Sequence, residues 1–192
     1  MPYYSGERGP SDAPPVRRVL VVMAHPDDAE FTAAGTVARW AREGATCVYL
    51  ICTDGNKGGN DAAATPAQLA AIRRQEQRAA LARLGGHAVW FLGFEDGVLA
   101  PTLPLRRAIT EAICRFRPDV VVCQDPTAYW IGSEYINHPD HRAAGEATLA
   151  AVFPTARNRL IFPELFTGGL EPHAVPVVYL AASERPDTWV DI

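Results

Sequence analysis

The sequence lacks the features of a membrane segment and of a nucleic-acid binder. No apolar run approaches the ~20 residues that a bilayer-spanning helix needs. Lys and Arg together number 18 against 22 Asp and Glu, and no basic stripe stands out that could pair with phosphates. We therefore expect neither a membrane nor a nucleic acid among the partners of this protein.

Cysteine is also scarce. The four cysteines (Cys47, Cys52, Cys114 and Cys123) show no Cys-x-x-Cys spacing and lie inside apolar segments. This pattern favours buried free thiols over disulfides or metal ligands. Because disulfides are rare in reducing compartments, it also predicts a cytoplasmic location.

The first residues have no apolar core of the kind that signal peptides carry. Residues 1–15 are instead rich in Pro, Gly and Ser, and we predict that they form a disordered lead-in. Residues 16–192 are enough for one domain with its own hydrophobic core. The predicted organisation is therefore a single domain behind a short N-terminal segment.

Short apolar segments alternate with longer helical patterns along this domain. Strands are predicted over 18–24, 46–53, 87–92, 118–123 and 175–181, and helices over 30–42, 66–84, 103–116 and 138–152. The alternation predicts an α/β three-layer sandwich: a Rossmann-like, mostly parallel sheet with helices on both faces. Right-handed crossovers would bring the carboxyl ends of the strands to one edge, where ligands bind in such sheets.

The second predicted helix has a capping residue and an apolar pattern. Thr65 is a favoured N-cap and Pro66 suits the first helical position. The apolar residues expected to face the core are Leu69, Ile72, Ala79, Ala80 and Leu84.

Two short motifs of histidine and aspartate each follow a predicted strand, at residues 24–28 and 138–141. His25 and Asp28 are three residues apart at a strand-to-helix turn, so both side chains can reach one ion. His141, one turn into its helix, can complete the set. Three protein ligands leave a position for water, as in catalytic zinc sites. We predict Zn²⁺, with Fe²⁺ as an alternative because two histidines and a carboxylate also suit non-haem iron.

Two further polar groups of the motifs are left for acid–base chemistry. Asp27, adjacent to a ligand, is placed to take a proton from metal-bound water as a general base. If Asp140 hydrogen-bonds His138, this histidine would be held as an imidazolium that stabilises an oxyanion or protonates a leaving amine. A structural alternative is that Asp27 and Asp28 simply cap the helix that begins near residue 30.

Both motifs, with their neighbours at 24–30 and 137–142, resemble the signatures of the LmbE/PIG-L family of zinc-dependent N-acetylglucosaminyl deacetylases. The similarity continues in matching order through 53–59, 73–76, 92–97 and 117–122. The resemblance implies an LmbE-like fold and removal of acetyl from an N-acetylglucosamine-type amide, or cleavage of a related amide. Because family members tend to continue for a few dozen residues beyond position 192, it also implies that part of the C-terminal region is lacking.

The resemblance carries over roles for individual residues. His25, Asp28 and His141 would be the metal ligands, Asp27 the base, and His138, oriented by Asp140, the oxyanion stabiliser and acid. Arg73 matches a position that contacts substrate, and Asp96 lies in a matching active-site loop. For both residues a structural role without substrate contact stays open. Arg73 could be a solvated charge paired with neighbours such as Glu76 or Gln77, and Asp96 could belong to an ordinary turn.

Two loops are further candidates for substrate contacts. The segment 129–137 carries aromatic side chains next to the second motif, which suits stacking on a sugar, and we predict contacts from Tyr135 and Asn137. Trp130 and Tyr135 could equally pack this loop down. In the glycine-rich loop 54–61, Lys57 and Asn60 could touch a sugar, although satisfying the turn is the favoured interpretation.

These observations predict a metal-dependent hydrolase that removes the acetyl group from an N-acetylglucosamine-type sugar or sugar conjugate. One alternative is a metal-dependent hydratase of an unsaturated carboxylate on the same fold. Another is a non-catalytic sugar-binding module, which the filled positions at Asp27 and His138 disfavour. The expected partner is a small amino-sugar substrate, and a homo-oligomer stays open.

Overall fold

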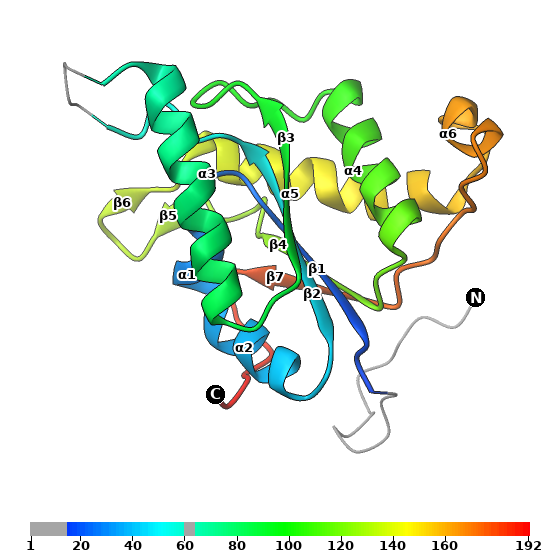
Figure 1. Ribbon diagram of the computed structural model, residues 1–192, viewed down its shortest axis with the longest axis horizontal. Helices are drawn as coiled ribbons and strands as arrows, with labels where there is room; N and C mark the ends of the chain where they lie inside the picture. The colour runs from blue at the N-terminus through cyan, green and yellow to red at the C-terminus, as the bar shows by residue number, and fades with distance from the viewer. Residues whose placement is uncertain (1–14, 60–63) are drawn as a thin grey trace.

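A computed structural model describes residues 15–59 and 64–192. Residues 1–14 of the predicted lead-in and the proposed contact of Asn60 therefore lie outside the described residues. The central sheet consists of β1 (Arg18–Met23), β2 (Thr46–Thr53), β3 (Ala88–Phe94), β4 (Val120–Gln124) and β7 (Val177–Ala181). These strands run parallel in the order β3-β2-β1-β4-β7, which is the Rossmann-like arrangement that the sequence predicts (Figure 1).

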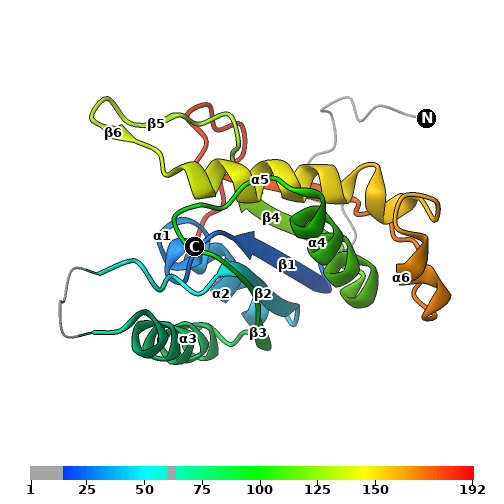
Figure 2. The same cartoon turned by 90° about the horizontal axis from the view of Figure 1, so that it is seen from above.

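Helices cover both faces of the sheet (Figure 2). One face carries α1 (Asp28–Thr32), α2 (Ala34–Arg42) and α3 (Pro66–Arg83), and the other carries α4 (Leu103–Phe116) and α5 (Pro139–Val152). The remaining elements are a small antiparallel hairpin of β5 (Trp130–Ile131) and β6 (Tyr135–Ile136), a 3-10 helix (Thr155–Arg157) and α6 (Pro163–Thr167). Within the described residues, no helix combines the length and apolar character needed to cross a membrane.

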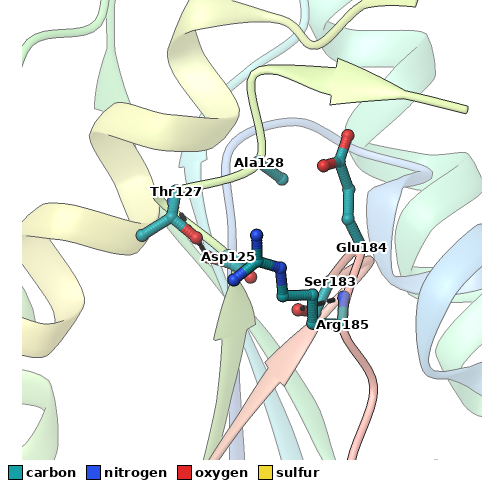
Figure 3. A pocket seen from close by; sticks show the side chains of 6 residues that line it. All are labelled: Asp125, Thr127, Ala128, Ser183, Glu184 and Arg185. Carbon is teal, nitrogen blue, oxygen red and sulfur yellow. Dashed lines mark hydrogen bonds between the residues drawn. The ribbon is translucent and has the colours of Figure 1, made fainter. Parts of the chain in front are cut away.

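The sheet reverses its direction of growth between β1 and β4. Strands β2 and β3 extend it on one side of β1, while β4 and β7 extend it on the other. Ligands bind at such a switch point, beyond the carboxyl ends of the strands. Just after β4 and β7 lies a cavity of about 270 Å³, lined by Asp125, Thr127, Ala128, Ser183, Glu184 and Arg185 (Figure 3).

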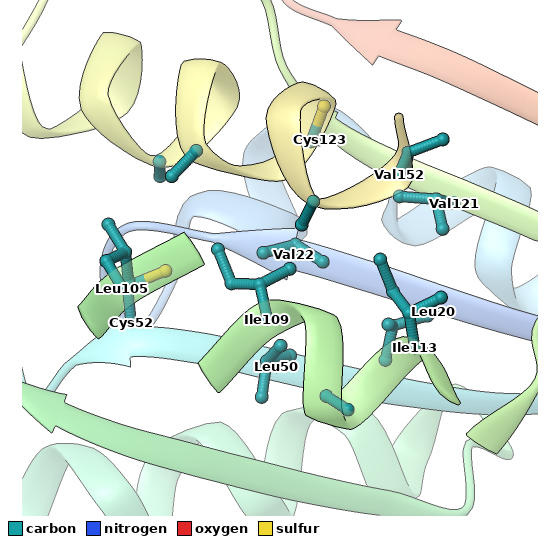
Figure 4. Close-up of a cluster of buried hydrophobic side chains, with 14 of the residues drawn as sticks. Leu20, Val22, Leu50, Cys52, Leu105, Ile109, Ile113, Val121, Cys123 and Val152 are labelled. Carbon is teal, nitrogen blue, oxygen red and sulfur yellow. The ribbon is translucent and has the colours of Figure 1, made fainter. Parts of the chain in front are cut away.

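The core explains why β1 is apolar along its whole length. Leu20 and Val22 pack with residues of α4 and α5 (Figure 4), whereas Val19 and Val21 pack on the side of α2 and α3. All four side chains are fully buried. A strand covered on both faces has no polar alternation, so the continuous apolar run correctly predicted a central parallel strand.

The cysteines are free and buried, as predicted. Burial raises the pKa of Cys47 to about 11 and that of Cys123 to about 12. Because the thiolate is the reactive form, these side chains behave as small apolar residues of the core.

One predicted helix, over 30–42, is in fact two. α1 ends at Thr32 and α2 begins at Ala34, because Ala33 has φ −136° and ψ −5°, outside the helical region. The break allows the two helices to occupy different positions relative to the sheet. α1 begins with the polar residue Asp28 at the sheet edge, while α2 packs Val37 into the core.

The predicted core-facing side of α3 is also partly wrong. Ile72 is 51% exposed and Ala79 is exposed, whereas Gln77 and Leu81 are buried. Polar side chains of α3 occupy part of its inward face. The spacing of apolar residues therefore misidentified which side of this helix points into the molecule.

α5 approaches β4 so closely that one position requires glycine. A Cβ at Gly145 would overlap the carbonyl oxygen of Gln124 and lie 3.1 Å from Cδ of Pro126. Gly145 lies one helical turn after His141, so this contact sets the distance between the second motif and the end of β4.

Gly145→Ala should therefore destabilise the protein. Alanine in a helix normally gains roughly 0.5–1 kcal/mol over glycine, but overpacking against a backbone oxygen should cost about 1–3 kcal/mol. Denaturant unfolding of the variant, beside the matched control Glu146→Ala on the exposed side of α5, measures the difference. A Gly145→Ala protein at least as stable as the wild type would show that α5 can move away from β4.

Candidate metal centre

The first motif forms the turn between β1 and α1. Ala24 is tied to β4 because its N–H donates to Oε1 of Gln124 at 3.1 Å. Asp27 then adopts a left-handed conformation, with φ 88° and ψ −24°, and Asp28 begins α1. His25 and Asp28 are both buried, with exposed fractions of 7% and 8%. The turn thus directs both side chains into the switch point of the sheet.

The Asp28 carboxylate lies between two histidines. Its Oδ2 accepts the backbone N–H of His25 at 2.7 Å and Nε2–H of Gln124 at 3.0 Å, and lies 3.3 Å from Nδ1 of His25. Its Oδ1 lies 3.0 Å from Nε2 of His141. Burial on its own would raise the pKa of Asp28, but the interactions with His141 and His25 outweigh it and hold the pKa well below the usual range.

A buried amide fixes the tautomer of His141. Nδ2 of Asn137 donates to the carbonyl oxygen of Ala128 at 2.6 Å, so its Oδ1 faces Nδ1 of His141 at 2.9 Å. Nδ1 therefore carries a proton, and Nε2 is the nitrogen that faces the other predicted ligands. Nε2 lies 3.0 Å from Oδ1 of Asp28, so these two atoms share either a proton or a metal ion.

Carboxylates fix the orientation of His25 in the same way. Nε2 lies 3.2 Å from Oδ1 of Asp96 and 3.3 Å from Oδ2 of Asp140, so it carries a proton. Nδ1 is left facing Oδ2 of Asp28. Burial lowers the pKa of His25, but the three carboxylates together raise it above its ordinary value.

These three side chains offer ligand atoms to one ion. The nearest ligand atoms of His25, Asp28 and His141 lie within 4.8 Å of one another. Two imidazole nitrogens and a carboxylate oxygen, with the other ring nitrogens held by acceptors, form a donor set that fits a divalent transition metal. The geometry therefore brings together the three ligands predicted from the sequence.

A second group of potential ligands, His25 with His138 and Asp140, overlaps the first. Its donors are already engaged. Nδ1 of His138 accepts the backbone N–H of Asp140 at 3.1 Å, and the proton on Nε2 of His25 faces carboxylates. The group around Asp28 is the better candidate because Nδ1 of His25 and Nε2 of His141 both face its carboxylate.

The structure does not show a hydrogen bond from His138 to the Asp140 carboxylate, the contact on which the predicted imidazolium depends. Oδ1 of Asp140 lies 3.7 Å from Nδ1 of His138, beyond hydrogen-bond range. The fully buried carboxylate instead accepts the N–H groups of Gly97 at 2.8 Å and Leu99 at 3.2 Å, and contacts His25. Asp140 therefore holds the loop after β3 and orients a predicted metal ligand.

His138 is consequently not held as an imidazolium. Burial and the neighbouring His25 lower its pKa, which outweighs the attraction of Asp140. Since Nδ1 accepts a hydrogen bond from the Asp140 N–H, the neutral ring carries its proton on Nε2. Its side chain is 43% exposed, so this proton can be offered to a bound molecule.

Asp27 does not cap α1 with its side chain, so the structural alternative for Asp27 is wrong. Its carboxylate is 55% exposed and pairs with Arg73, whose Nη2 lies 2.8 Å from Oδ2. Burial raises the pKa of Asp27, while Arg73 opposes that shift. Asp27 and Asp28, though adjacent in sequence, thus occupy different environments.

Two of the predicted substrate contacts serve the protein instead. Asp96 is 5% exposed, and its carboxylate accepts the backbone N–H of Lys57 at 2.7 Å and contacts His25. Asn137 is 4% exposed and uses its amide on His141 and Ala128. Their small polar side chains were correctly placed near the site, but both orient predicted ligands.

The other candidate residues in the loops differ in the exposure and contacts of their side chains. Tyr135 is 69% exposed and Trp130 is 51% exposed, so the alternative in which these rings pack the loop down is wrong. Lys57 binds Asp96 through its backbone and pairs through Nζ with Glu95 at 2.7 Å. For Lys57, the structure agrees with the interpretation that it satisfies the turn.

Sequence reasoning missed Gln124. This side chain connects Ala24 to Asp28, because it accepts from one and donates to the other. A signal existed: Gln124 is a polar residue at the end of an apolar strand, where a ligand site is expected.

Comparison with known proteins places this geometry in a family. Residues 20–152 match the PIG-L family, described as GlcNAc-PI de-N-acetylase. The diacetylchitobiose deacetylase of Thermococcus kodakarensis is 33% identical over 92% of this chain and 64% of the relative. The 1D-myo-inositol 2-acetamido-2-deoxy-alpha-D-glucopyranoside deacetylase of Rhodococcus erythropolis is also 33% identical, over 90% of this chain and 68% of the relative.

A solved structure supports the same conclusion. The N,N'-diacetylchitobiose deacetylase of Pyrococcus horikoshii, crystallised with an inhibitor, superposes with a TM-score of 0.85 and 29% identity. The alignment covers 92% of this chain and 64% of that one, so the chain spans a little under two thirds of its length. Taken with the match over residues 20–152, these similarities show that the chain belongs to the PIG-L family.

Proposed function

We propose that this protein is a divalent-metal-dependent hydrolase that removes the acetyl group from an N-acetylglucosamine-type sugar or sugar conjugate. The observation that carries the proposal is the Asp28 carboxylate, which faces Nδ1 of His25 and Nε2 of His141 at a sheet edge. The relatives named as deacetylases of N-acetylated sugars give the substrate class.

His25, Asp28 and His141 would hold the ion. Zn²⁺ is the proposed metal because two imidazoles and a carboxylate are a frequent ligand set of catalytic zinc sites, and Fe²⁺ is the alternative. When bound, such an ion supplies Lewis-acid chemistry, because it polarises the amide carbonyl and lowers the pKa of water. Asp96, Asp140 and Asn137 would keep the two imidazoles in the tautomers that this binding requires.

Asp27 would act as the general base. Its carboxylate is half-exposed and directly precedes the ligand Asp28, so it can reach a water molecule at the site. It takes the proton of the attacking water as the new C–O bond forms at the amide carbon. The proton then passes to the departing nitrogen, and the C–N bond breaks to give acetate and the free amine.

His138 would stabilise the charge that develops on the carbonyl oxygen. Nε2–H of the neutral ring is a hydrogen-bond donor on a partly exposed side chain. A donor placed before the reaction needs no reorganisation when the oxyanion forms. Tyr135, exposed on β6 in the loop that leads to His138, is the predicted contact with the sugar ring.

The first experiment measures acetate release from N-acetylglucosamine, its oligomers and its conjugates. Asp27→Asn should lower kcat by about 10²–10⁴-fold, because it removes the base while keeping the shape. Metal content, measured by atomic emission, should stay at the wild-type level. Asp54→Asn, which removes a carboxylate paired with Arg74 in the neighbouring loop, is the matched control and should retain activity.

Two outcomes would decide against the deacetylase. Bound metal without acetate release from any amide would favour the hydratase, which the same panel tests with unsaturated carboxylates. Sugar binding that Asp27→Asn leaves unchanged would favour the sugar-binding module.

A second prediction concerns the ligand set itself. His25→Ala should abolish high-affinity binding of Zn²⁺, and Asn137→Leu should weaken it by about 10–100-fold, because His141 loses the acceptor that fixes its tautomer. Competition with a chromogenic chelator measures both affinities. Thr127→Val, a substitution in the same loop at a residue bound only to Asp125 among the described contacts, is the control. Unchanged affinity in His25→Ala would overturn the assignment.

A further inference from the structure

We propose that α3 positions the general base: Arg73 and Gln77, one helical turn apart, together hold Asp27 in its left-handed conformation. This inference rests on the proposed function, in which Asp27 takes the proton. It assigns Arg73 a role through Asp27, in place of the substrate contact that the family resemblance implies.

Asp27 needs support from outside its own turn. A non-glycine residue at φ 88° is strained and persists only where its surroundings impose it. The Asp27 side chain makes no capping hydrogen bond within α1. The carbonyl oxygen of Asp27 accepts N–H groups of α1, but its own N–H and its carboxylate are held by residues of a neighbouring element.

Gln77 holds the backbone end of Asp27. Oε1 of Gln77 accepts the N–H of Asp27 at 2.8 Å, while Nε2 donates to Oε1 of Glu30 at 2.9 Å. Gln77 is 2% exposed, so its amide has little freedom to turn. A buried amide with both ends engaged fixes the N–H direction of the strained residue.

Arg73 holds the side-chain end of Asp27. Its Nη2 donates to Oδ2 of Asp27 at 2.8 Å and to the carbonyl oxygen of Pro26 at 2.7 Å, and its Nη1 donates to the carbonyl oxygen of Gly55 at 2.9 Å. The side chain is 14% exposed. One guanidinium thus joins the first motif to the glycine-rich loop, and its planar fork fixes the direction of the carboxylate.

The glycine-rich loop is shaped around this guanidinium. A Cβ at Gly55 or at Gly58 would overlap Nη1 of Arg73. Gly55 also requires glycine for its backbone, with φ 61°, but Gly58 does not have a positive φ. The close approach that glycine permits at position 58 is therefore made by Arg73.

Arg74 provides a matched control. It is adjacent in sequence and also binds the same loop, through two hydrogen bonds to Asp54 at 2.8 and 2.7 Å. Among the described residues it forms its hydrogen bonds with Asp54 and not with Asp27. A comparison of the two arginines therefore separates the positioning of Asp27 from general support of the loop.

The kinetic test compares Arg73→Met with Arg74→Met. Arg73→Met should lower kcat about 10–100-fold, the effect of a misplaced catalytic group, with KM and metal content unchanged. Arg74→Met should change neither constant. A raised KM with unchanged kcat in Arg73→Met would overturn the proposal and assign Arg73 to the substrate.

A double mutant tests whether Arg73 acts through Asp27. In an Asp27→Asn background, Arg73→Met should cause no further loss of kcat, because residues that act as one unit are non-additive. Methylguanidinium added to Arg73→Ala should restore part of kcat and should leave Arg74→Ala unaffected. Additive losses in the double mutant would overturn the proposal.

A structural readout keeps the inference separate from the activity. Hydrogen exchange of the peptide containing Asp27 should accelerate at least tenfold in Arg73→Met, in Gln77→Leu and in Gly58→Ala, which displaces the guanidinium without removing it. It should not accelerate in Arg74→Met. An inactive wild type would defeat the proposed function alone, whereas unchanged exchange in all three variants would defeat the positioning role.

Discussion

The Asp28 carboxylate and the two imidazoles that face it constrain three elements of the fold at once. Its Oδ2 accepts from the backbone of the turn after β1 and from Gln124 at the end of β4, and its Oδ1 faces His141 on α5. A buried carboxylate is stable only where hydrogen-bond donors or a cation surround it. The arrangement therefore persists only because buried hydrogen bonds hold each partner, and those bonds connect the sheet to the helix above it.

The packing of α5 makes this possible. Gly145 lets the helix backbone approach the carbonyl of Gln124, and His141 lies one turn earlier on the same helix. Asn137, just before α5, then sets the proton of His141 through a bond of 2.9 Å. Gly145 thus allows α5 to pack closely against β4. The side-chain amide of Asn137 then determines which nitrogen of His141 is available for a ligand.

Much of this could be predicted from the sequence, for a physical reason. Strands of parallel sheets end at a common edge, so motifs after β1 and before α5 had to meet there. The partners of Asp140 could not be predicted, because its carboxylate reaches the N–H groups of Gly97 and Leu99, more than 40 residues away. The inward side of α3 was misjudged since Gln77 is buried by hydrogen bonds, which apolar spacing does not register.

The two adjacent aspartates show how one residue's backbone divides two roles. In a regular helix, consecutive side chains are separated by a fixed rotation of about 100°. The left-handed turn at Asp27 instead leaves one carboxylate 55% exposed beside Arg73 and the next one 9% exposed between histidines. Carboxyl groups whose environments differ in this way take different chemical roles. The strain at Asp27 is therefore the feature that allows one Asp-Asp pair to offer both a buried anion and an accessible one.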